Sequence, residues 1–263
     1  MVEVSLSHSG LPGGRLARLG PLTGAIEESV DAEDCAAFGR IVDRLLQPCS
    51  NNPIGPGGAL DIAVTDLDRM ALVLYRHHFG NYIESRVICV SCDQPFEVKV
   101  DLSRFSLERP SGAVNGVGGP DANGQFRMDS GQSFRLPTLR DQLAVSDLDG
   151  ETARQVLIQR CCDRSDLDPE AANALEAAME VVGPLGAGQI SAPCPHCGTT
   201  KTEASFSIQQ AFLEALGLER RFLDLEVHYL ARVYNWSRAE ILAMPTDDRR
   251  IHVRMILAEA ARG

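Results

Sequence analysis

The stretch ISAPCPHCGTTKTEASFSI (residues 190–208) decides the fold of this chain, because its layout repeats that of an earlier stretch, RVICVSCDQPFEVKVDL (residues 86–102). In each stretch, a short apolar lead-in reaches two cysteines that are separated by two residues. A polar turn follows, and an alternating strand then leads to a phenylalanine on the next element, Phe105 or Phe212. Each stretch therefore predicts a β-hairpin around a C-x-x-C motif.

The two motifs together supply four thiolates. Structural zinc takes four nitrogen or sulfur ligands in a tetrahedron. We therefore expect one structural Zn²⁺, held by Cys89, Cys92, Cys194 and Cys197. We interpret this arrangement as a split zinc ribbon. Residues 93–193 separate the two pairs, which is a far longer insertion than the usual ribbon loop.

A C-x-x-C motif can instead be a redox pair, and Cys194-Pro195-His196-Cys197 contains a dipeptide that strong thiol oxidants use. A redox motif has to open a helix, because the helix N-terminus lowers the pKa of the attacking thiol. Here residues 198–202 have turn and strand character without helical periodicity. The context therefore favours metal binding. Two unrelated C-x-x-C pairs are the other alternative, and the matching layout of the two hairpins argues against it.

Composition places the chain among soluble globular proteins. It has 263 residues, of which 44% are hydrophobic and 23% charged. No apolar run approaches the roughly 20 residues that a membrane span needs. The first five residues do not resemble a secretory signal, which would have a basic segment followed by an apolar core. We expect synthesis in the cytosol, where thiols stay reduced.

The remaining cysteines are not expected to bind metal, and the net charge limits the kinds of partner that the protein can bind. We expect Cys35, Cys161 and Cys162 to be small buried residues on helices, and Cys49, beside a Pro/Gly-rich loop, to be a free thiol. The net charge of −11 argues against a nucleic-acid surface, which needs clustered Lys and Arg. We predict no membrane partner and no small-molecule substrate, and a protein partner fits best.

Periodicity and capping signals predict an α+β fold that is mainly helical. We expect an N-terminal arm and helices over residues 1–82, then the split zinc ribbon over residues 83–208, and a C-terminal helical unit over residues 209–263. The ribbon region would contain a helical insertion at about 137–183 and a Gly-rich loop at 110–131. This loop has almost nothing large enough to pack, so we expect its tip to be mobile and protease-sensitive.

Capping signals predict two helix starts. We expect Asp168 to be the N-cap before Pro169 at the first helical position, and Ser237 and Glu240 to form a capping box.

Two helix patterns give further expectations. The last helix should turn Ile251, Met255 and Ile256 inward. The paired His77 and His78 invite a metal interpretation, but adjacent helical residues point about 100° apart. We therefore do not expect the two imidazoles to share an ion.

Several separated motifs resemble one known family. The most specific is W-S-x-x-E-I-L-x-M-P, at residues 236–245, which follows Glu226-Val227-His228-Tyr229-Leu230-Ala231 and precedes Asp248-Arg249-Arg250. Leu22-Thr23-Gly24 before Glu27-Glu28, the two cysteine pairs, and Arg135-Leu136-Pro137-Thr138 before Asp141 agree with it. Over nearly the whole chain, the sequence resembles the T-even-type phage baseplate hub assembly family of contractile phages, prophages and related injection systems.

This resemblance implies a structural or assembly role at the hub of a contractile tail, with other baseplate, hub or tail proteins as partners and no enzymatic activity. The family's cysteine pairs map onto Cys89, Cys92, Cys194 and Cys197. Family members differ in whether they stay in the particle or leave as chaperones. The Gly-rich loop at 110–131 is longer than the family pattern.

Two other function classes compete with this one. The alternative is a zinc-ribbon factor associated with nucleic acid, and a third class is a metallohydrolase. A hydrolase needs an open coordination position on its zinc, whereas four cysteines close the shell. No G-x-S-x-G nucleophile elbow occurs either. We expect no catalytic residues.

Overall fold

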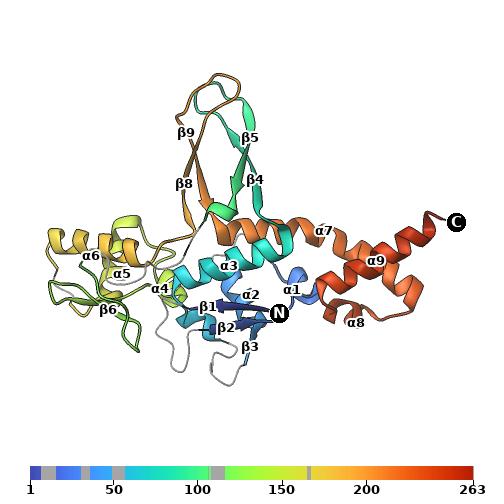
Figure 1. Cartoon of the computed structure of the whole chain (residues 1–263), viewed down its shortest axis with the longest axis horizontal. Coiled ribbons are helices and arrows are strands. Elements are labelled where there is room, and N and C mark those ends of the chain that lie inside the picture. Colours follow the sequence, from blue (N-terminus) through green and yellow to red (C-terminus); the bar gives the residue numbers. More distant parts are fainter. Residues whose placement is uncertain are drawn as a thin grey trace.

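The computed structural model describes residues 1–6, 16–30, 36–48, 57–105, 107, 116–164 and 167–262. These residues form a mixed fold of helices and small antiparallel sheets, so the predicted α+β class is confirmed (Figure 1). The predictions for Cys35, Cys49 and the tip of the Gly-rich loop lie outside the described residues. Within them, every helix is too short or too polar to cross a membrane.

Short runs of helices and short runs of strands follow one another along the chain. The helices are α1 (Gly24–Glu28), α2 (Ala37–Leu45), α3 (Val64–Phe79), α4 (Leu139–Ala144), α5 (Gly150–Cys161), α6 (Pro169–Val182), α7 (Ile208–Tyr234), α8 (Arg238–Ala243) and α9 (Thr246–Ala260), with short 3₁₀ turns at Gly58–Asp61 and Leu102–Arg104. The strands are β1 (Val2–Ser5), β2 (Leu16–Leu19), β3 (Leu46–Gln47), β4 (Tyr82–Ile88), β5 (Pro95–Asp101), β6 (Gln125–Arg127), β7 (Ser133–Arg135), β8 (Ala187–Ala192) and β9 (Thr202–Ser207).

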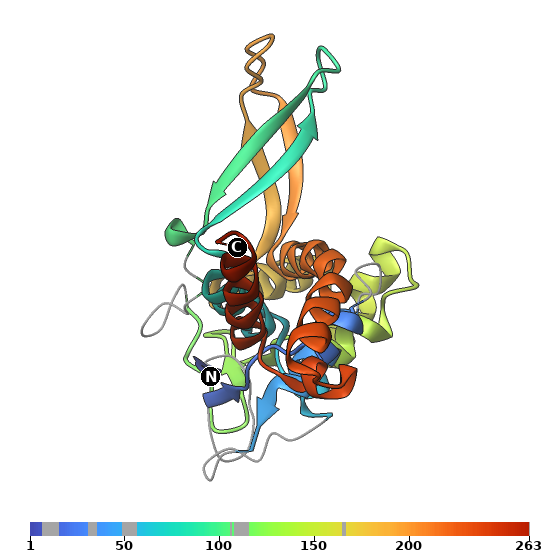
Figure 2. The ribbon, with the colours of Figure 1, turned by 90° about the vertical axis from the view of Figure 1, so that its right-hand side faces the viewer.

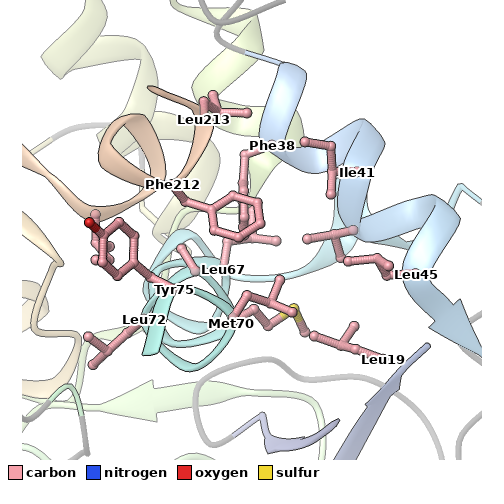
Figure 3. Close-up of a cluster of buried hydrophobic side chains, with 14 of the residues drawn as sticks. Leu19, Phe38, Ile41, Leu45, Leu67, Met70, Leu72, Tyr75, Phe212 and Leu213 are labelled. Carbon is pink, nitrogen blue, oxygen red and sulfur yellow. The ribbon is translucent and has the colours of Figure 1, made fainter. Parts of the chain in front are cut away.

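The main core surrounds α3, which packs between α2, the first half of α7 and the sheet β1-β2-β3. Figure 3 shows how side chains from these elements meet, with Phe38 of α2 against Phe212 of α7. The two rings lie edge to face at 5.6 Å between centroids. Each large apolar side chain buried in this way contributes about 1.5–3 kcal/mol. We call this core, with the elements that form it, the platform of the molecule; the other parts of the described chain are attached to it.

A two-hairpin arm stands out from this platform in both views (Figures 1 and 2). One hairpin is β4-β5 and the other is β8-β9, and each is a separate two-stranded antiparallel sheet. At the base of the arm, Phe105 and Phe206 bring the hairpins together with ring centroids 5.4 Å apart. The two stretches predicted as hairpins around C-x-x-C are therefore hairpins, and they are neighbours despite their separation in sequence.

The segment between the hairpins builds its own small core from α5, α6 and the hairpin β6-β7. The predicted helix start at Asp168 and Pro169 is confirmed, because the Asp168 carboxylate accepts the Ala171 amide. Residues 110–115 of the Gly-rich loop lie outside the described part. Within residues 116–131, however, the expectation of little packing is wrong. Phe126 is fully buried and stacks on Phe134, because the two residues are directly paired in the β6-β7 hairpin. Gly124, with φ 75°, lies in the turn before β6.

The C-terminal helical unit combines the second half of α7 with α8, α9 and the distant α1. The predicted capping box is present, with the Ser237 and Glu240 side chains each accepting the other's backbone amide. Helix α7 runs without a break past Gly217, so one helix serves two cores. The Thr246 amide donates to the Leu22 carbonyl at 2.9 Å, which fastens the N-terminal segment to α9.

The predicted inward face of α9 is wrong for Ile251 and Met255, whereas Ile256 does pack against the C-terminal core. Ile251 and Met255 are about half exposed (47% and 50%), and Ile256 is only partly buried. The inward side chains are Arg249 and Val253. Apolar periodicity failed here because the buried stripe is centred on a charged residue whose partners come from other elements.

Candidate metal centre

Two turns of the same local geometry position the predicted metal ligands. The Cys89 amide donates to the Gln94 carbonyl at 3.0 Å, and the Cys194 amide donates to the Thr199 carbonyl at 2.8 Å. The residue after each second cysteine has left-handed backbone, with φ 54° at Asp93 and φ 73° at Gly198. Glycine adopts this conformation without steric cost and aspartate tolerates it better than most residues. Each turn thus aims two thiols to one side.

The four predicted cysteines come together in the turns between β4 and β5 and between β8 and β9. These turns form the outer end of the arm (Figure 1). Their sulfur atoms all lie within 4.8 Å of one another. The Cys89 and Cys197 sulfurs are 3.6 Å apart, and the Cys92 and Cys194 sulfurs are 3.8 Å apart. In a tetrahedral four-thiolate site with metal–sulfur bonds of about 2.3 Å, adjacent sulfurs are about 3.8 Å apart. The cluster can therefore hold a metal ion.

The cluster forms a small core of its own. Cys89 and Cys194 are buried together with Phe96 and Ala192, whereas Cys92 is half-buried and Cys197 is exposed. This group is separate from the main core at the base of the arm. This apolar group is too small to hold the tips of the two hairpins together by itself. A shared metal ion would link the two tips.

The thiols of the cluster differ in how readily they ionise. Burial opposes ionisation of Cys89, but hydrogen bonds from the Ser91 amide and the Thr202 hydroxyl outweigh it and lower the pKa of Cys89 to about 6. The Gln94 amide lowers the pKa of Cys92, but burial and the neighbouring sulfur atoms raise it to about 12. One thiol ionises readily and the next resists, because two thiolates at this distance repel each other. A cation is needed to hold all four as thiolates.

The surroundings also bear on the redox alternative. Residues after Cys197 form a turn and then β9, so no helix N-terminus faces either cysteine pair. His196 is exposed and is not among the clustered ligand atoms. Four sulfurs fill the tetrahedron and leave no position for water or substrate. Of the other predicted cysteines, Cys161 is buried and Cys162 is half-buried.

The motif residues at the two ends of the chain meet in a buried ion-pair cluster. Arg249 is fully buried, and its guanidinium donates to the carboxylates of Glu27 and Glu226. The Thr246 hydroxyl also donates to Glu27. A Cβ at Gly24 would lie 2.9 Å from Arg249 Nη1, so the glycine makes room for the guanidinium. These residues hold α1, α7 and α9 together.

A second group of potential ligands contradicts an expectation from the sequence. The ligand atoms of His77, His78 and Asp247 all lie within 4.8 Å of one another, so the two imidazoles can share an ion. The angle of about 100° between adjacent helical residues does not keep the two rings apart, because both side chains bend toward each other and their ring centroids are 4.7 Å apart. The third ligand comes from α9, which the sequence did not connect with this pair.

In comparisons with known proteins, no family model, no curated protein and no solved structure matches the chain.

Proposed function

We propose that this chain is a non-enzymatic structural or assembly protein of a contractile tail baseplate hub, in a phage or a related injection system. It would act through protein–protein contacts with other hub, baseplate or tail proteins. The metal in its arm would be one structural Zn²⁺ in a split zinc ribbon. The observation that carries the proposal is the closed four-cysteine cluster at the end of a projecting arm, together with the family resemblance of the sequence.

Zinc is the ion best suited to the cluster. Four sulfur ligands at tetrahedral spacing favour Zn²⁺ or an iron–sulfur centre over harder cations. The sulfur–sulfur distances of 3.6 and 3.8 Å suit one ion. Such a closed site can fix the two hairpins but cannot activate a water molecule, which favours a structural role over hydrolysis.

Several residues of the motifs that carry the family resemblance form ion pairs that hold the fold together, which supports a structural role. Glu27, Glu226 and Arg249 bury their charges against one another. Arg135 and Asp141 form an ion pair at the start of α4, and Arg160 joins the same carboxylate. These ion pairs join segments that are far apart in the sequence, and this accounts for the motif. Function would then reside on the assembled surface.

The arm offers a contact surface for a protein partner. Ile88 and Val90 are about two-thirds exposed (67% and 64%) beside the first cysteine pair. The arm otherwise carries mixed charges, including the pair of Lys99 with Glu84. Exposed large apolar side chains on a rigid projection suit burial against another protein, whereas a phosphate backbone would require clustered positive charge.

The proposal is tested by capture from cells that produce the tail. The parent chain should retain specific hub, baseplate or tail proteins, and the double variant I88S/V90S should lose most of them while keeping its metal. The control is L148S, which removes an exposed apolar side chain from another part of the molecule. Capture of nucleic acid, or tail assembly that proceeds normally without this gene, would contradict the proposal.

A further inference from the structure

We infer that His77, His78 and Asp247 form a second metal site, which takes a divalent transition-metal ion and leaves coordination positions open. The site joins the last turn of α3 to the first turn of α9. Its two imidazole nitrogens and one carboxylate oxygen lie within 4.8 Å of one another. The site is distinct from the four-cysteine cluster, because it uses no sulfur and belongs to the body of the protein.

The backbone that carries the ligands is fixed on both sides. The rings of His77 and His78 meet at 79°, so the edge of one ring points at the face of the other. His78 also packs against Phe79, which belongs to the main core. Asp247 lies between Thr246, whose amide is bound to the Leu22 carbonyl, and Arg249, whose guanidinium is buried. Small side-chain rotations would then bring the three donors to metal-bonding distance.

The three side chains are free to bind. Within the part of the chain that the structure describes, none of the three has a hydrogen-bond or ion-pair partner. His77 and Asp247 are exposed and His78 is half-buried, so the donor atoms can be reached from solvent.

The donor set determines the kind of ion. Two imidazoles and one carboxylate suit Zn²⁺, Ni²⁺, Co²⁺ or Fe²⁺ and leave one or more positions for water or another ligand. Asp247 also lines a surface hollow of about 440 Å³ with Glu219, Phe222, Arg250 and Arg254. The hollow is lined by both acidic and basic side chains, and Arg250 is paired there with Glu219. It therefore provides space beside Asp247 in which a water molecule or a side chain of another protein can complete the shell.

Binding at this site should couple the main core to the C-terminal unit. An ion that binds the folded chain and not the unfolded chain raises its stability by mass action. Because the ligands come from α3 and α9, the gain requires these helices to stay docked.

The test is calorimetric titration with Ni²⁺ of tag-free protein whose cysteine site already holds one zinc. We expect one further equivalent to bind, with affinity at least about tenfold weaker in H78A and in D247N, since loss of even an outer-shell partner costs 10–100-fold. The controls H228A and D248N remove an exposed imidazole and the adjacent exposed carboxylate, and should bind as the parent does. The conservative D247N keeps the comparison valid if H78A folds poorly.

A second measurement identifies the donors. Co²⁺ bound at this site should give weak visible absorption without sulfur-to-metal charge-transfer bands. No saturable binding by the parent, undiminished affinity in both H78A and D247N, or charge-transfer bands from the second ion would overturn the inference.

Discussion

The tip of the arm and the C-terminal unit both join distant segments of the chain, but the interactions that join them differ. Each brings together segments that are far apart in sequence: Cys89 meets Cys197, and Glu27 meets Arg249. The tip has few buried apolar residues and places four thiols around one point. The C-terminal unit has a larger apolar cluster around a buried guanidinium. The tip should therefore depend on an external ion, whereas the unit carries its own counter-charges.

The largest expected effect is at the tip. Replacing Cys194 with Ser should abolish tight metal binding and loosen both hairpins, because structural zinc contributes on the order of 10 kcal/mol at neutral pH. Thermal unfolding with zinc and after chelation measures the effect. The control is C162S, which alters a half-buried cysteine outside the cluster and should respond to chelation as the parent does. If C194S keeps its zinc and unfolds at the same temperature as the parent, the tip does not depend on the metal ion.

The next effect is in the C-terminal unit. Replacing Arg249 with Leu leaves the buried Glu27 carboxylate without its cationic partner, and loss of one member of a buried pair costs about 3–5 kcal/mol. Denaturant unfolding should show this loss with metal present or removed, in contrast to C194S. R238M, which breaks exposed pairs with Glu28 and Asp224, should cost far less. Equal losses in R249L and R238M would contradict the account.

A smaller effect concerns acid stability. Burial opposes ionisation of Asp141, but hydrogen bonds from Arg135, Thr138 and Arg160 outweigh it and hold its pKa well below the usual value. A carboxylate whose pKa is lower in the folded chain stabilises the protein above about pH 4, and this contribution is lost as pH falls below that value. D141N should lose about 1–2 kcal/mol at pH 7.

Unfolding measured from pH 7 to pH 2 checks the sign. D141N should differ from the parent at neutral pH, and the difference should shrink with acid. A difference that grows below pH 4 would show that the carboxylate does not act through its ionised form.

The smallest effect is at the capping box. Ser237→Ala removes a side chain that accepts the Glu240 amide at the start of α8, and such a loss costs about 1 kcal/mol. Thermal unfolding should register it in the C-terminal unit and leave metal content unchanged. A change in bound metal would show that the two regions are coupled more closely than their separate cores indicate.

The sequence predicted the features whose signals are local. The C-x-x-C hairpins, the caps at Asp168 and Ser237, and the α+β class follow from spacing, turn residues and periodicity. Convergence of the two cysteine pairs was predictable because the ligand number of a tetrahedral site requires four donors.

Contacts between distant segments were not predictable in the same way. Burial of Arg249 depends on Glu27, and the proximity of His78 to Asp247 depends on how α9 packs on α7 beside the end of α3. No periodicity in α9 signals either contact, because Ile251 and Met255 offer a more apolar stripe that turns outward. Phe126 was missed for a similar reason, since its partner Phe134 follows a Gly-rich segment that reads as a loop.

The most direct test of the account is X-ray absorption at the zinc edge on D247N protein holding one zinc per chain. This variant removes a ligand of the inferred second site, so the signal should report the cysteine cluster alone. The account predicts four sulfur neighbours at about 2.3 Å and no nitrogen or oxygen in the first shell. A first shell with nitrogen or oxygen, or failure of the reduced protein to retain zinc, would contradict the claim that the two hairpins share one closed metal site.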